Sequence, residues 1–199
     1  MPWQEFTALL VLATAMSFTP GPNTTLSAAL AANGGVRHAV RFVLAVPVGW
    51  CLLLGLCAAG LGTLANEQPM LRGAIKVLGI SYLLWLAWQM AASRPLASTG
   101  NAVWHIGFVQ GVLLQFINIK AWLLALTIVA GWVAGQPQWL MRLGIVLPVM
   151  AFFAASSNLL YACMGAALRQ WLTQGQRLCW FNRGMALLLV ATAVWMLAA

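Results

Sequence analysis

The chain alternates long apolar runs with short polar stretches. Uncharged runs cover residues 6–36, 42–66 and 143–168. Each is longer than the roughly 20 residues that an α-helix needs to cross a bilayer. The runs are continuous and rich in Leu and Ala, whereas the strands of a membrane β-barrel alternate lipid-facing and lumen-facing residues over about ten positions. The pattern therefore predicts an all-α integral membrane protein.

Glycine, proline and charged residues divide this pattern into six candidate membrane-spanning helices. We expect them at about 3–32, 39–64, 70–92, 104–134, 139–168 and 181–199. The clearest linker, SRPLASTGN at 93–101, lies near the midpoint. It divides the chain into two three-helix repeats, 1–95 and 96–199, that we expect to form one membrane domain.

Composition supports this class, because 63% of the residues are hydrophobic and 6% are charged, against about a quarter charged in soluble domains. The basic residues behind the +8 charge are scattered singly, which argues against nucleic acid as a partner and indicates a lipid bilayer. Loops rich in Lys and Arg stay in the cytoplasm. The first, third and fifth loops hold six arginines: Arg37, Arg41, Arg94, Arg169, Arg177 and Arg183. Only three basic residues lie on the opposite side of the membrane, so we expect both termini outside the cytoplasm. With three helices in each half, the second half enters the membrane from the opposite side to the first, so the two repeats should be inverted.

The middle of the first expected helix holds a run that should interrupt it: Thr19, Pro20, Gly21, Pro22 and Asn23. Proline lacks an N–H and clashes with the carbonyl four residues earlier, so the two prolines free the carbonyls of Met16 and Phe18. Freed carbonyls are tolerated in hydrocarbon only against protein or a water-lined cavity. We expect a break here, and a local break at Pro47 in the second helix for the same reason.

A helix that restarts at Pro22 after Gly21 would point the amides of Asn23 and Thr24 into that cavity. Carbonyl oxygens and a positive helix end then lie close together, which suits the ammonium and the carboxylate of an amino acid. The alternative is a proline kink that serves packing alone. Two prolines around a glycine, with Asn23 beside them, favour a binding site.

The centre of the fourth expected helix holds Gln115, Asn118 and Lys120. Lys120 is the one formally charged residue deep inside an expected span, where its burial costs at least about 3 kcal/mol. The chain has no Asp and both Glu lie outside the spans, so its partner is a freed carbonyl, Asn118, a hydroxyl or a substrate carboxylate. The alternative is a lysine that extends from a helix end towards the interface.

These two features occupy equivalent points of the two halves, and we expect both the first and the fourth helix to be discontinuous there. Inverted repeats whose disrupted first helices meet near the midplane are the sequence pattern of a transporter site. A third polar group lies on the fifth expected helix and comprises Ser156, Ser157, Asn158 and Tyr161. Its members either line the pathway or form hydrogen bonds between helices.

The runs TPGPNTTLSAALAANGGVRHAVR at 19–41 and FINIKAWLLAL at 116–126 resemble the LysE/RhtB family of bacterial amino-acid exporters. The likeness extends over the whole chain and includes Asn182-Arg183-Gly184 before the last helix. Most of the family has Asn-Pro-Lys on the fourth helix; the aliphatic residue of Asn118-Ile119-Lys120 is similar to the cysteine/O-acetylserine exporter branch. The resemblance implies a multi-pass protein of the bacterial inner membrane, and in that membrane the distribution of basic residues in the loops predicts both termini in the periplasm.

We therefore expect an exporter of small neutral amino acids or derivatives, similar to cysteine and O-acetylserine or to homoserine and threonine, that works by alternating access. The carboxylate would meet Lys120 and the amides of Asn23 and Thr24, and the ammonium would meet Asn118 and the freed carbonyls. The expected substrate-binding residues are Met16, Phe18, Thr19, Pro20, Gly21, Pro22, Asn23, Thr24, Gln115, Asn118, Lys120, Asn158 and Tyr161.

The family is regarded as proton-coupled, and many relatives carry an acidic residue on the second helix, but residues 45–50 contain none. Whether protons are the coupling ion is therefore open. Either Lys120 or a tyrosine takes up the proton, or the substrate or water carries it, or export runs down the substrate gradient without coupling. A homodimer is likewise open. We expect no cofactor and no metal, since no His lies in a ligand spacing with Asp, Glu or Cys. A membrane-embedded enzyme or a non-transporting scaffold subunit is the alternative.

Overall fold

The computed structural model describes residues 1–61, 68–92 and 106–198, and all regular elements in these ranges are helices. This confirms the expected all-α class. The elements are α1 (Trp3–Phe18), α2 (Pro22–Gly34), α3 (Val36–Leu56) with its extension η1 (Cys57–Leu61), α5 (Pro69–Ala92), α6 (Phe108–Ile117), α7 (Ile119–Ile128) with η2 (Val129–Val133), α8 (Trp139–Leu172) and α9 (Arg177–Ala198). The linker expected at 93–101 lies outside the described residues.

Four of the described helices are long and apolar enough to cross a membrane. They are α3 with most of its extension, α5, α8 and α9. A fifth span forms if α6 and the helix that follows it, which meet at 68°, cross as one bent pair. The remaining two helices, α1 with 16 residues and α2 with 13, are each shorter than a bilayer requires. The chain is thus a multi-pass membrane protein.

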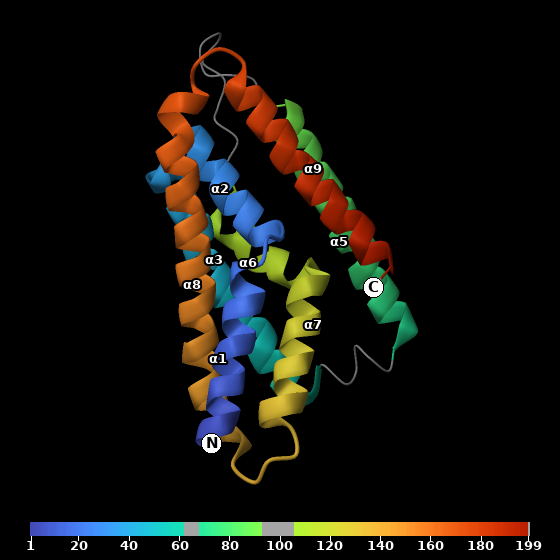
Figure 1. Ribbon diagram of the computed structural model, residues 1–199. Helices are drawn as coiled ribbons and strands as arrows, with labels where there is room; N and C mark the ends of the chain where they lie inside the picture. The colour runs from blue at the N-terminus through green and yellow to red at the C-terminus, as the bar shows by residue number, and fades with distance from the viewer. Residues whose placement is uncertain (62–67, 93–105, 199) are drawn as a thin grey trace.

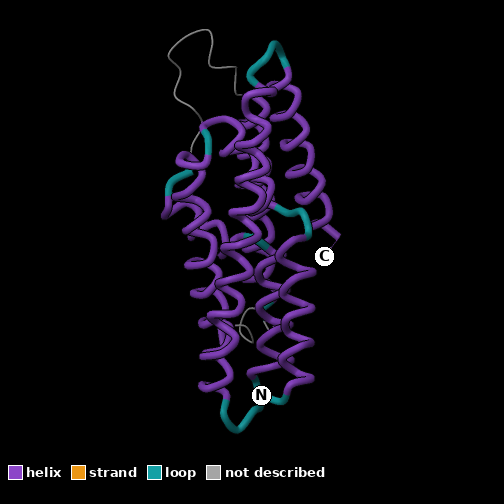
Figure 2. The backbone as a smooth tube through the Cα atoms, turned by 60° about the vertical axis from the view of Figure 1, so that its left-hand side comes forward, coloured by secondary structure: helices purple, strands orange, loops and turns teal. Residues whose placement is uncertain are grey.

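The helices run lengthwise along an elongated molecule, with most turns at its two ends (Figure 2). In Figure 1, α8 extends along one side, while α5 and α9 lie side by side on the other. Between them, α1 and α7 occupy the lower half, α2 occupies the upper half, and α6 crosses the middle. Among the described residues, the two larger of three apolar clusters form around α2, α3, α5 and α9 and around α1, α3, α7 and α8.

The expected break at Pro47 is wrong, because α3 continues through that residue without interruption. A single proline inside a membrane helix removes one backbone hydrogen bond, and neighbouring helices compensate for the loss. Here α6 and α8 pack along α3. By contrast, the two prolines of residues 20–22 flank a glycine, and there the helix is interrupted as expected.

Small residues allow α2 to lie deep inside the bundle. Nearly every residue of α2 is buried, and α3, α8 and α9 surround it. A Cβ atom built on Gly165 of α8 would lie 2.1 Å from the carbonyl oxygen of Ala28 on α2, so the two backbones touch. Gly79 of α5 meets the carbonyl of Ile117 in the same way, at 2.1 Å. Such contacts are typical of packing between membrane helices.

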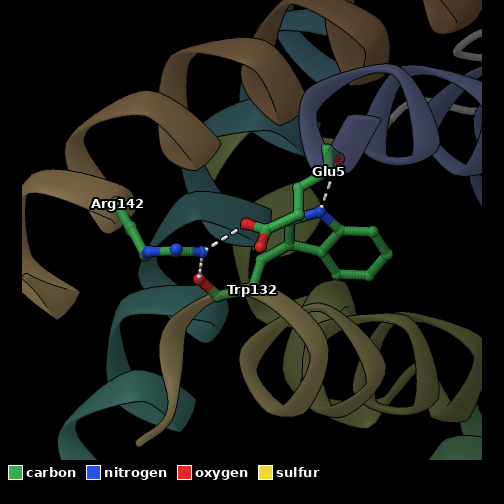
Figure 3. Close-up of polar contacts among 3 residues, drawn as sticks. All are labelled: Glu5, Trp132 and Arg142. Atoms are coloured by element: carbon green, nitrogen blue, oxygen red, sulfur yellow. Dashed lines mark hydrogen bonds and ion pairs between the residues drawn. The ribbon is translucent and has the colours of Figure 1, made fainter. Parts of the chain in front are cut away.

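A polar cluster joins the start of α1 to the second half of the chain (Figure 3). The Arg142 guanidinium lies 2.6 Å from the Glu5 carboxylate, and it also donates to the carbonyl of Trp132 at 3.4 Å. The Trp132 indole donates to the backbone carbonyl of Glu5 at 2.8 Å. These contacts connect α1, η2 and the first turn of α8 at the end of the bundle where the chain begins.

Replacing Glu5 by Gln is expected to reduce stability only slightly, because this carboxylate is 40% exposed and an exposed ion pair contributes less than about 1 kcal/mol. The indole contact to the backbone survives the change. Thermal unfolding of purified protein, followed by tryptophan fluorescence, measures the difference from wild type. That difference should shrink at high salt, which screens the pair; a difference independent of salt would contradict an ionic origin.

Candidate functional site

The first break separates α1 from α2 by three residues in extended or coil conformation. Helix α1 ends at Phe18, and α2 begins at Pro22 after Gly21, whose backbone is fully extended (φ −171°, ψ −176°). The Thr24 hydroxyl accepts a hydrogen bond from the Gly21 N–H at 3.0 Å and donates to the Gly21 carbonyl at 3.1 Å. Thr24 therefore caps the first turn of α2, and the other backbone N–H groups of that turn point towards the break.

The second break lies at Asn118, between α6 and α7, without a proline. Asn118 has an extended backbone, and its side chain caps α7 by accepting the Lys120 N–H at 3.1 Å. The Trp122 indole donates to the carbonyl of Phe116 at 2.7 Å and so supplies a partner to the end of α6. Side chains that compete for backbone groups thus produce this break.

The two breaks meet. The Lys120 ammonium donates to the carbonyl of Thr19 at 3.1 Å, and a Cβ atom on Gly21 would lie 3.2 Å from the same nitrogen. Asn23 and Gln115 exchange two amide hydrogen bonds of 2.8 and 3.1 Å. The Tyr161 hydroxyl of α8 donates to the carbonyl of Phe18 at 3.0 Å. Residues from distant parts of the sequence therefore converge on the unwound segment of the first helix.

An inner cavity of about 60 Å³ lies at this junction. Nine of the expected site residues line it: Met16, Thr19, Gly21, Pro22, Asn23, Thr24, Asn118, Lys120 and Asn158. The other four do not. The Tyr161 hydroxyl donates a hydrogen bond to the Phe18 carbonyl, and Gln115 forms hydrogen bonds with Asn23. Pro20 lines a second cavity.

This second, lateral cavity has a volume of about 360 Å³. It shares Met16, Thr19, Gly21 and Lys120 with the inner cavity, so the lysine and the unwound segment lie between the two. Its remaining lining residues are Pro20, Thr25, Leu188, Ala191, Thr192 and Trp195. The last four belong to α9, which the sequence did not indicate as part of a site.

The family model of LysE type translocators matches residues 14–199 of the chain. The chain belongs to the LysE family. Cysteine/O-acetylserine efflux proteins of three bacteria are similar to it: that of Klebsiella pneumoniae is 32% identical over 94% of both chains. That of Salmonella typhimurium is 33% identical over 89% of this chain and 90% of its own, and that of Escherichia coli K12 is 32% identical over 92% and 91%. No solved structure gives a significant match.

Membership of the LysE family confirms the resemblance carried by the two sequence runs and favours a transporter over a membrane enzyme. Together with the apolar helices, it identifies a multi-pass protein of the inner membrane. The match to the family model runs over residues 14–199 of this LysE family member, so both breaks lie within the region of similarity.

The electrostatics of this LysE family site are simple. Lys120 is partly buried, and the ion pair between Glu5 and Arg142 does not involve it. The polar side chains that line the inner cavity are neutral apart from the lysine. One positive charge therefore lies in a low-dielectric space surrounded by hydroxyl and amide groups, an environment that favours an anionic ligand.

The α8 polar group divides between the two roles considered for it. Ser157 lines the inner cavity. Asn158 also lines it, but its side-chain oxygen accepts from Ser27 of α2 at 2.8 Å, a contact between helices. A buried pair that the sequence did not indicate, Asn33 of α2 with Asn182 of α9, exchanges amide hydrogen bonds of 2.8 and 3.0 Å.

Several lining residues of the inner cavity were missed because apolar residues in an apolar span carry no signal. They are Val46 and Trp50 of α3, Ala121 and Leu124 of α7, and Met150 and Ala154 of α8. The spacing of four between Val46 and Trp50, and between Met150 and Ala154, places each pair on one helix face. Without the structure, that spacing is indistinguishable from ordinary packing.

Proposed function

We propose that this translocator exports small neutral amino acids or their derivatives, of the cysteine and O-acetylserine kind, out of the cytoplasm. The observation that carries the proposal is the Lys120 ammonium at the junction of two broken helices, in a cavity whose other described polar groups are neutral. The names of the similar efflux proteins support the same substrate class.

The substrate carboxylate would bind between Lys120 and the start of α2. Gly21, Pro22, Asn23 and Thr24 all line the inner cavity, so the positive end of the α2 dipole faces it. A carboxylate at this position gains both the ammonium and the helix end. A cationic amino acid would bring a second positive charge close to Lys120, which disfavours it.

The substrate ammonium would replace that of Lys120 at the carbonyl of Thr19. This oxygen already accepts an ammonium hydrogen bond, at 3.1 Å, so its surroundings suit a cation. When Lys120 turns to the incoming carboxylate, the Thr19 carbonyl becomes free for the substrate. The sequence alone predicts the substrate ammonium at the carbonyls of Met16 and Phe18. We propose Thr19 instead, because the Phe18 carbonyl already accepts a hydrogen bond from the Tyr161 hydroxyl.

Transport would proceed by alternating access across six spans, with α1 and α2 as one broken span and the two halves as inverted repeats. The inner cavity of about 60 Å³ is well below the roughly 300 Å³ of an ordinary small-molecule site, so helices must separate to admit a substrate. The end of the bundle that holds Arg37 and Arg169 would face the cytoplasm, and the end with Glu5 the periplasm.

The proposal is tested by the extracellular amino-acid profile of cells that overexpress the protein, compared with an empty vector. We expect cysteine, O-acetylserine or another small neutral amino acid to accumulate outside. Proteoliposomes of the purified protein, loaded with the same solute, should release it, and neutral amino acids should compete where lysine does not. Accumulation of lysine, or a profile equal to the vector control, would contradict the proposal.

Replacing Pro20 and Pro22 together by Ala is expected to lower export, because the restored N–H groups would favour a continuous helix and close the unwound segment. Export rates are compared at equal membrane abundance. The matched control is Pro47→Ala, which removes a proline from the uninterrupted α3. If the double variant exports as fast as wild type, the broken helix has no role in transport.

A further inference from the structure

The lateral cavity opens on the outside of the helix bundle. On α9, Leu188 is 43% exposed and Trp195 is 50% exposed, although both line the cavity. Helix α9 is a candidate membrane span over Arg177–Leu197, so its exposed surface faces lipid. The mouth of the cavity therefore lies within the membrane, where lipid molecules are the available occupants.

The interior of the cavity combines apolar walls with one cationic group. Its volume of about 360 Å³ falls within the roughly 300–1,000 Å³ of small-molecule sites. Met16, Leu188 and Trp195 supply apolar surface, and the Lys120 ammonium lies at the inner end beside the unwound segment. None of the described residues that line the cavity is acidic. An apolar tail with an anionic head matches this distribution.

We propose that the lateral cavity binds a single-chain fatty acid from the bilayer, with its carboxylate at Lys120 and its chain along α9. A phospholipid fits less well, because its charged headgroup stays at the interface, whereas Lys120 lies inside the span. A fatty acid has a small head that becomes neutral on protonation, so it reaches such a depth without carrying a charge through hydrocarbon. On binding it releases this proton to the aqueous phase, and the resulting carboxylate accepts a charge-assisted hydrogen bond from the Lys120 ammonium.

This ligand has a consequence for the transport site that rests on the proposed function. Both cavities share Lys120, so a fatty acid carboxylate and a substrate carboxylate compete for the same ammonium. Fatty acid in the membrane would thus inhibit export. The binding itself is independent of which solute is exported.

The test uses purified full-length protein in phosphatidylcholine nanodiscs and a diazirine-bearing palmitic acid as the probe. After illumination, labelled positions are mapped by mass spectrometry. We expect labels concentrated at Leu188, Ala191, Thr192 and Trp195 and removed by excess unlabelled palmitate. The methyl ester of the probe, and the acid probe on Lys120→Gln protein, should bind about tenfold more weakly, because each lacks one charge of the pair.

Two variants of α9 provide the steric test. Ala191→Phe fills the cavity and should lower labelling about tenfold, as expected when a bound group loses its space. Val194→Phe adds the same ring to an exposed neighbour that does not line the cavity, and should leave labelling unchanged. Both positions tolerate bulk because they lie on the outer surface of α9.

Three outcomes would overturn the inference. Equal labelling by the acid and the ester excludes the contact with Lys120. Labelling spread evenly over the lipid-facing surface, Val194 included, excludes a specific cavity. Displacement by phenylalanine but not by palmitate assigns the cavity to the amino-acid site. Because the assay measures no transport, failure of the proposed export leaves a positive labelling result intact.

Discussion

Replacing Lys120 by Ala is expected to abolish export while the protein still inserts into the membrane. The change removes the ammonium that bonds to the Thr19 carbonyl, and with it the positive charge of the inner cavity. A charge-assisted hydrogen bond contributes about 1.5–3 kcal/mol, so substrate binding should fall about ten- to a hundredfold. The measurement is the rate of solute release from proteoliposomes that contain equal amounts of each protein.

The matched control for this variant is Lys76→Ala. Lys76 lies on α5, where its ammonium donates to the carbonyl of Leu197 at 2.8 Å, and it lines neither cavity. The Lys76→Ala variant should therefore export as fast as wild type. Stability should stay equal or rise in Lys120→Ala protein, since burial of a charge is costly. Loss of the variant from the membrane would instead mark Lys120 as a structural residue.

Replacing Gly165 by Ala is expected to destabilise the protein more than any other single-methyl change on α8. The new Cβ would lie 2.1 Å from the carbonyl oxygen of Ala28, and both groups belong to helix backbones that cannot turn aside. Helix α2 would have to move away from α8, although hydrogen bonds join the two at Ser27 and Asn158. Overpacking of this kind costs about 1–3 kcal/mol.

Gly144→Ala provides a control on the same helix. A Cβ atom on Gly144 has no atom within 4 Å apart from its own stretch of helix, so the added methyl group meets open space. Alanine is the better helix former by about 1 kcal/mol, so this variant should be as stable as wild type or more stable. Both variants are compared by yield of monodisperse protein and by thermal unfolding. Equal unfolding temperatures would contradict the tight contact between α2 and α8.

The sequence predicted those parts of the site where a residue conflicts with its surroundings. Pro20 and Pro22 conflict with a helix, which predicted the first break. Lys120 conflicts with hydrocarbon at the equivalent point of the second half, and the second break lies beside it. Pro47 raised the same conflict, but packing around α3 resolves it. A single proline thus gives a weaker prediction than two prolines around a glycine.

The parts that could not be predicted depend on which helices become neighbours. Leu188 and Trp195 are ordinary residues of an apolar span until α9 lies beside the first break. Likewise, the hydrogen bonds of Asn182 could not be predicted, because its partner Asn33 is 149 positions away in the sequence. One helix end also differs from the expectation: α8 continues to Leu172, past the expected end at 168, and the chain turns soon afterwards at Gly175, whose φ of 61° does not fit a helix.

Helix α2 is joined to three different helices by side-chain pairs that carry no charge. Asn23 bonds to Gln115 of α6, Ser27 to Asn158 of α8, and Asn33 to Asn182 of α9. Neutral amides can exchange one partner for another without leaving a buried ion unpaired, and dissolved salt does not screen them. The energetic cost of moving α2 within the membrane should therefore be the same at low and at high salt concentration, even where the salt concentration outside the cell varies.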